Sequence, residues 1–156
     1  MAKKSGFDFS GMFKDIENRI IGVLADKGNQ GIGQEIFANA TRQLVYPLYH
    51  KTQYKRRMES GGLADPKNYE IESTGLSTTI TNNTESNYNQ PHPSGGFIND
   101  IIESGTGYEW TRSEIYEDSP WPRPFMDEAA KSYAEYLLTM IDIVVFNGDG
   151  NGVASA

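Results

Sequence analysis

The stretch Pro120-Trp121-Pro122-Arg123-Pro124-Phe125 joins three alternating prolines to the most regular amphipathic pattern in the chain. Proline fixes φ and biases the preceding residue away from the α region, so a helix can begin only at or after Pro124. Beyond this point, apolar residues recur at helical spacing opposite a polar face. The pattern predicts a long C-terminal helix with a stripe made of Phe125, Met126, Ala129, Tyr133, Leu137, Met140, Ile141 and Val144.

Two further helices are predicted in the N-terminal third of the chain. Apolar residues at helical spacing indicate a first helix from about Ser10 to Lys27, which Gly28-Asn29-Gln30-Gly31 is expected to end. A second helix is expected from Gly33 to about Tyr49. Pro47 should kink this helix or limit its last turn, because proline lacks an N–H and clashes with the preceding turn.

The middle of the chain changes to a β pattern. Tyr69, Ile71 and Ser73 alternate with glutamates, and Thr74-Gly75 follows them, which predicts a hairpin over about residues 69–81. Residues 82–96 are polar and rich in Asn, Ser, Pro and Gly, which is typical of a loop. A short helix is expected from Phe97 to Ile102, ending at Gly105.

These elements predict an α+β fold, in which N-terminal helices, a small antiparallel sheet, a short helix and the long C-terminal helix pack together. We divide the chain into an N-terminal helical extension (1–29), an α+β domain (30–146) and a flexible, glycine-rich tail (147–156). No signal peptide or membrane span is expected, because the longest apolar stretch is short and contains Asp142.

Charge is distributed unevenly along the 156 residues. Ten Lys/Arg against six Asp/Glu give residues 1–60 a net charge of +4, whereas four against fifteen give residues 61–156 a charge of −11. The total of −7 argues against nucleic acid as the main ligand, since neutralisation of phosphate charge dominates that kind of affinity. A basic and an acidic half can instead pair within a subunit or between subunits.

No pattern in the chain indicates catalysis, a cofactor or a metal site. Cysteine is absent, which excludes thiol nucleophiles and thiolate ligands, and His50 and His92 have no partners at metal-ligand spacing. Residues 28–33 have their glycines in the wrong order for a dinucleotide fingerprint. Residues 147–152 match the first half of a calcium loop without its bidentate carboxylate. We therefore expect neither cofactors nor enzymatic activity.

Several motifs resemble, in order, those of neck or tail-completion proteins of tailed bacteriophages. The resemblance covers about residues 30–146. It rests on Tyr46-Pro47 followed by Thr52 to Arg57, the predicted hairpin, Ile102-Glu103-Ser104-Gly105-Thr106, and Pro122-Arg123-Pro124-Phe125-Met126 with Ala129. It implies a non-enzymatic virion protein that is made in the host cytoplasm and forms a homo-oligomeric ring around the DNA channel at the head–tail junction. Its implied partners are other copies of itself, head-completion or connector proteins, tail-terminator or tail-tube proteins, and passing DNA bound without sequence specificity, but no membrane.

Aromatic residues and arginine dominate the energetics of protein interfaces, so the proline segment and its neighbours are expected to dock on other molecules. The interface candidates are Trp121, Arg123, Pro124, Phe125, Lys51, Lys55, Arg56, Arg57, Glu103, Tyr108 and Trp110. An alternative interpretation is a small non-enzymatic binding or regulatory module that recognises an acidic partner or nucleic acid through the basic residues 51–57.

Overall fold

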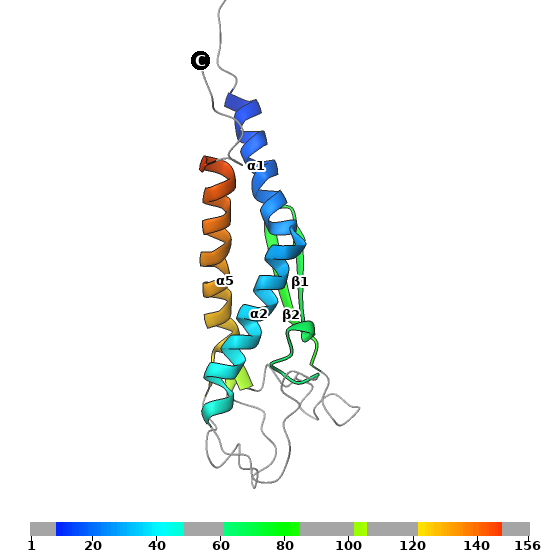
Figure 1. Ribbon diagram of the computed structural model, residues 1–156, viewed down its shortest axis with the longest axis vertical. Helices are drawn as coiled ribbons and strands as arrows, with labels where there is room; N and C mark the ends of the chain where they lie inside the picture. Colours follow the sequence, from blue (N-terminus) through cyan, green and yellow to red (C-terminus); the bar gives the residue numbers. More distant parts are fainter. Residues whose placement is uncertain (1–8, 49–60, 85–101, 106–121, 148–156) are drawn as a thin grey trace, which may run out of the picture.

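The computed structural model describes residues 9–48, 61–84, 102–105 and 122–147 (Figure 1). Helices α1 (Phe9–Ala25) and α2 (Lys27–Leu44) follow one another as a long, bent rod. Helix α5 (Phe125–Asp142) lies along this rod, and the strands β1 (Tyr69–Thr74) and β2 (Ser77–Asn82) lie along another side of it (Figure 1). The predicted α+β fold with a long C-terminal helix is confirmed.

The junction between α1 and α2 differs from the prediction that residues 28–31 end the first helix. That prediction is wrong, because α1 ends at Ala25 and α2 begins at Lys27. Asp26 stands between them and caps α2, its carboxylate accepting the Asn29 N–H at 2.9 Å. The side chain of Asn29 in turn donates to the Val23 carbonyl at 2.9 Å. Asp26 therefore caps the start of α2, and Asn29, from the stretch that looks like a helix breaker, caps the end of α1.

The hairpin forms where the alternating pattern predicted it. Tyr69 pairs with Asn82 and Thr74 with Ser77 in an antiparallel register, and Gly75 occupies the turn with φ of 59°. This positive φ favours glycine. Tyr69 and Ile71 point inward and are buried, and the Ser73 hydroxyl donates to the Leu24 carbonyl at 2.8 Å. The hairpin is therefore attached to the end of α1 as well as to the core.

Two hydrophobic clusters hold the elements together. The larger one joins α1, α2, β1 and α5, and its buried members are Val23, Leu24, Phe37, Ala38, Tyr69, Ile71, Ala129, Tyr133 and Leu137. The smaller one consists of Val45, Leu63, Ile102 and Phe125. The predicted stripe of the C-terminal helix is confirmed, because all its members are buried or packed against these clusters.

Prolines lie close to the start of α5 and to the end of α2. Helix α5 begins at Phe125 with Pro124 at its N-cap position, as predicted, and continues into a π-helical turn, η3 (Ile143–Asn147). Helix α2 ends at Leu44, and Pro47 lies in the short 3-10 helix η1 (Tyr46–Leu48). The predicted division at residue 30 falls inside α2, and α1 shares the larger core with the other elements.

Candidate interface region

The segment before α5 is held by its own chain. The Arg123 N–H donates to the carbonyls of Ile102 and Glu103 at 3.1 and 3.2 Å, and the Phe125 N–H donates to the Arg123 carbonyl at 2.7 Å. Residues 102–104 form a short helical turn, which Gly105 ends with φ of 66°. The proline-containing segment before α5 is thus bound to this turn through backbone hydrogen bonds.

Glu103 supplies the cap that Pro124 lacks at the start of α5. Pro124 makes no side-chain hydrogen bond to the helix. The Glu103 carboxylate instead accepts the Met126 N–H at 3.0 Å and the Asp127 N–H at 3.3 Å. Because a helix N-terminus carries unsatisfied N–H groups and a partial positive charge, a carboxylate there is stabilising. The structure therefore gives Glu103, an interface candidate, a role within the subunit.

Two further interface candidates are covered by their own chain. Phe125 is fully buried in the smaller cluster, and Arg123 is 3% exposed. The expectation that a neighbouring molecule covers these two side chains does not fit this arrangement, because Val45, Leu63 and Ile102 already pack around Phe125. Pro124 is exposed.

The remaining interface candidates lie outside the described residues. These are Lys51, Lys55, Arg56, Arg57, Tyr108, Trp110 and Trp121. Their contact role stays a prediction.

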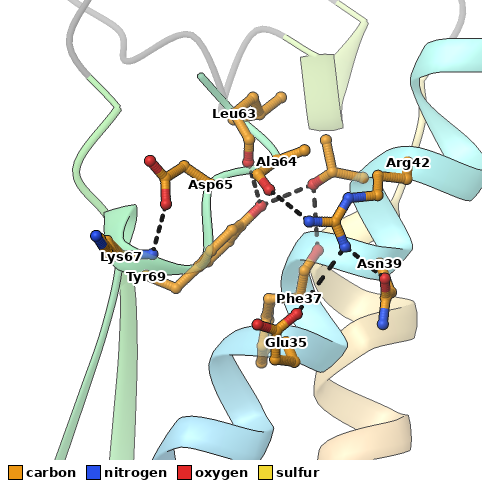
Figure 2. Close-up of polar contacts among 10 residues, drawn as sticks. Glu35, Phe37, Asn39, Arg42, Leu63, Ala64, Asp65, Lys67 and Tyr69 are labelled. Carbon is orange, nitrogen blue, oxygen red and sulfur yellow. Dashed lines mark hydrogen bonds and ion pairs between the residues drawn. The ribbon is translucent and has the colours of Figure 1, made fainter. Parts of the chain in front are cut away.

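A polar network fixes residues 61–69 on α2 (Figure 2). Arg42 donates to the Ala64 carbonyl at 3.2 Å and to the Asn39 side chain at 2.6 Å. The Tyr69 hydroxyl donates to the Leu63 carbonyl at 2.9 Å and lies 2.7 Å from the Thr41 hydroxyl. Burial raises the pKa of Tyr69 to about 12, so its hydroxyl stays protonated and remains a donor at neutral pH.

Asp65 organises the turn that leads into the hairpin. Its carboxylate accepts the Gly61 N–H at 2.8 Å and the Lys67 N–H at 3.0 Å. These two backbone hydrogen bonds lower the pKa of Asp65 below its ordinary value of 3.8, and the bond from Gly61 has the larger effect. Pro66 follows as the first residue of the 3-10 helix η2 (Pro66–Asn68). Asp before Pro is a typical N-cap pattern, and it is a sequence signal that could have identified this turn.

The network and the smaller cluster lie at the same end of the molecule, opposite the N-terminal end of α1 (Figure 1). Val45, Leu63, Ile102 and Phe125 meet there, and the Tyr46 hydroxyl accepts the Ala64 N–H at 3.1 Å. The chain leaves the described structure after residues 48, 84 and 105 and returns at residues 61, 102 and 122. Three segments, including those with the basic and aromatic interface candidates, are therefore anchored at one end.

The described residues include a groove beside the α1–α2 junction and contain no cluster of possible metal ligands. A shallow groove beside the α1–α2 junction contains one lysine and one glutamate, and its lining consists of Ala25, Lys27, Gln30, Ile71, Glu72, Ser73 and Thr74. Within the ranges that the structure describes, no three His, Cys, Asp or Glu residues gather into a possible metal site. No described helix is both long and apolar enough to cross a membrane.

A family model matches residues 8–142, from the residue before α1 to the last residue of α5. The chain belongs to the YomN family. YomN is a phage-associated, Bacillus phage SPbeta-like family. No curated protein and no solved structure matches the chain.

The YomN match includes both hydrophobic clusters and the region where the three segments are anchored. The expected relationship to bacteriophage is confirmed at this level. The narrower resemblance to neck and tail-completion proteins stays a prediction.

Proposed function

We propose that this YomN-family chain is a structural protein of a phage particle, which forms a homo-oligomeric ring around the DNA channel at the head–tail junction. The ring links head-completion or connector proteins to tail-terminator or tail-tube proteins. Membership of a phage-associated family is the observation that carries the proposal. The ordered resemblance to neck proteins supports the proposed position at the head–tail junction.

The charges of the anchored segments support assembly of copies side by side. Residues 49–60 hold four Lys/Arg and one Glu, a net charge of +3, whereas residues 106–121 hold one Arg and four Asp/Glu, a net charge of −3. A closed ring needs two different, complementary patches on each subunit. These two segments of opposite charge, whose flanking described residues lie at one end of the fold, would provide such a pair if the basic segment of one copy faces the acidic segment of the next.

Deletion of the gene from its phage tests the position in the particle. We expect electron micrographs of the lysate to show filled heads and separate tails, since the joining layer is missing. Joined, infectious particles without the protein would contradict the proposal. A finding that the purified protein binds DNA and never enters particles would favour the alternative binding module.

Charge reversal tests the ring contact. We expect Lys55→Glu with Arg56→Glu and Arg57→Glu to abolish ring formation, because like charges then meet at every contact. Adding Glu114→Lys, Glu117→Lys and Asp118→Lys in the same chain restores opposite charges and should restore rings. As a control, Lys14→Glu with Lys131→Glu changes the charge of exposed residues on α1 and α5, away from these segments, and should leave rings intact. Failure of the second reversal to restore rings would contradict the pairing of these segments.

A further inference from the structure

Strand β2 has a partner strand on one side only. The described sheet has the order β1–β2, and β1 is the strand that is attached to the helices. Gln34 of α2 donates to the Tyr69 carbonyl at 2.7 Å, and the Ser73 hydroxyl donates to the Leu24 carbonyl at 2.8 Å. The far side of β2 is therefore an edge of the sheet. An edge strand presents unpaired backbone groups to any strand that can approach it.

The pairing register shows which backbone groups of β2 point outward. The Asn83 N–H donates to the Asn68 carbonyl at 2.7 Å, so these residues are a hydrogen-bonded pair of the antiparallel ladder. Because such pairs alternate with pairs that are not hydrogen-bonded, Thr78 and Ile80 belong to the second kind. Their N–H and C=O groups point away from β1. Within the described residues, these four groups make no hydrogen bond.

Strand β2 has none of the features that usually keep an edge strand from pairing. Residues Ser77–Asn82 include no charged residue, proline or glycine, and the register with β1 continues over six pairs without a bulge. The strand is rich in Thr and contains Ile, which both favour strands. Natural edge strands that stay single usually carry Lys, Pro or a bulge. The edge is therefore suited to strand addition, in which backbone hydrogen bonds join an extended segment to a sheet.

The exposed face of the hairpin is acidic beside this edge. Glu70 and Glu72 of β1 are exposed and lie opposite Thr81 and Thr79 of β2. Neither glutamate makes an ion pair within the described residues. A strand added to β2 would lie two strand spacings, about 10 Å, from β1. Its Lys or Arg side chains, which are long, can cross the short threonines and reach the glutamates. Charge complementarity therefore favours a basic strand.

We propose that residues 51–57 of a neighbouring copy add to the edge of β2 as an antiparallel strand. No other stretch of seven residues in the chain has four basic side chains, and this one has no acidic residue. Alternate residues share one face of a strand, so Lys51, Lys55 and Arg57 lie together on the side of the glutamates. A basic strand on one copy and an acidic edge on the next are the two different patches that a closed ring requires.

This inference rests on the proposed contact between copies. It gives the basic segment of one copy a described surface on the next copy, the edge of β2. The hydrogen bonds come from the backbone of both strands, and the glutamates select the charge of the added strand.

A synthetic peptide of residues 50–58 tests strand addition without a need for rings. We expect the labelled peptide to bind full-length protein, diluted to single chains, in fluorescence anisotropy. In an antiparallel pair, residues opposite Thr78 and Ile80 share their face and donate to β2. Methylation of the backbone nitrogens at positions 52, 54 and 56 should therefore weaken binding at least about tenfold, because three hydrogen bonds are lost.

The matched control is the same peptide methylated at positions 53, 55 and 57. These N–H groups point away from β2, so binding should weaken less than about twofold. Both peptides keep all their charges. Equal effects of the two methylation patterns, or no binding of the unmodified peptide, would overturn the proposal.

Two pairs of charge variants test the role of the glutamates. Glu70→Gln with Glu72→Gln should weaken peptide binding about threefold or more, because two ion pairs across the sheet are lost. Glu17→Gln with Glu135→Gln makes the same change of net charge at exposed positions of α1 and α5, and should alter binding less than about twofold. Equal weakening by both pairs would show that only the net charge attracts the peptide, and would overturn the role of these glutamates.

Cysteine crosslinking tests whether the strand comes from another copy, because the natural chain has no cysteine. Two differently tagged variants, Thr79→Cys and Gln53→Cys, are mixed at a concentration above the dissociation constant of the peptide. A short bis-maleimide should give a band of two chains that carries both tags. Thr139→Cys, on the exposed face of α5, replaces Thr79→Cys as the matched control and should give no such band. Equal bands from both, or crosslinks only within single chains that carry Thr79→Cys and Gln53→Cys together, would overturn the proposal.

The outcomes separate this inference from the proposed function. Rings at the head–tail junction together with a peptide that does not bind would refute strand addition and leave the neck role standing. Peptide binding and crosslinks by a protein that never enters particles would refute the neck role and leave strand addition standing.

Discussion

Gly33 of α2 lies directly against the ring of Tyr133 on α5. A Cβ at Gly33 would lie 2.8 Å from Cε2 and Cζ of Tyr133 and 2.6 Å from Cδ1 of Ile71. Atoms in real structures do not approach a Cβ so closely, so only glycine fits here without movement of its neighbours. This contact brings α2, α5 and β1 together in the larger core.

The close packing at Gly33 predicts that alanine substitutions at Gly33 and Gly31 change the free energy of unfolding in opposite directions. Gly33→Ala should lower the free energy of unfolding, because overpacking costs about 1–3 kcal/mol and outweighs the gain in helix propensity. Gly31→Ala, which meets no atom within 4 Å, should raise it by roughly 0.5–1 kcal/mol. Urea unfolding followed by circular dichroism measures both. A stabilising Gly33→Ala would contradict the packing described for α2.

Removal of the hydroxyl group is predicted to change the free energy of unfolding differently at the two buried tyrosines, Tyr69 and Tyr133. Tyr69→Phe should destabilise the protein by about 1–3 kcal/mol, because the buried Leu63 carbonyl loses its donor at 2.9 Å. The Tyr133 hydroxyl is buried and makes no hydrogen bond within the described residues. Tyr133→Phe should therefore be neutral or stabilise by up to about 2 kcal/mol. Equal losses of unfolding free energy in the two variants would show that the Tyr69 network contributes nothing specific.

The cap on α5 predicts a measurable loss when Glu103 is truncated. Glu103→Ala should cost about 1 kcal/mol of unfolding free energy, since two N–H groups at the start of the helix lose their acceptor. Hydrogen exchange should accelerate at the amides of Met126 and Asp127. Glu135→Ala, on the exposed face of the same helix, is the matched control and should change stability by less than about 0.5 kcal/mol. A smaller loss for Glu103→Ala than for the control would rule out the cap.

Asp65 predicts a pH-dependent contribution to stability. Its pKa is lower in the folded chain than the ordinary 3.8, so the ionised carboxylate stabilises the fold above that pH. The contribution is lost as the pH falls from 3.8 through the lower folded value. Asp65→Asn should therefore be less stable than the natural chain at pH 7, and the difference should shrink below pH 3.8. A difference independent of pH would contradict the role of the carboxylate.

The sequence predicted elements whose pattern is local. Helix α5 and the hairpin are read from proline positions, helical spacing and period-two alternation, and all three signals act within a few residues. The junction at Asp26 was misread, because Gly28 and Gly31 suggested a break although the side chains of Asn29 and Gln30 cap α1. In this case caps from the following residues outweighed weak helix propensity.

The interface candidates show what a sequence cannot supply. Trp121 and Arg123 looked like parts of one docking arm, but Arg123 is bonded through its backbone to residues 102 and 103, which are distant in sequence. The Arg42–Ala64 and Thr41–Tyr69 contacts likewise join residues that only the fold brings together. No local pattern encodes such pairings.

Electron cryo-microscopy of purified particles from a phage that carries this gene tests the central claim most directly. We predict a ring of copies of this fold between head and tail, surrounding the DNA channel. Resolved neck and tail layers built wholly from other proteins, with this chain absent from the particle by mass spectrometry, would contradict it.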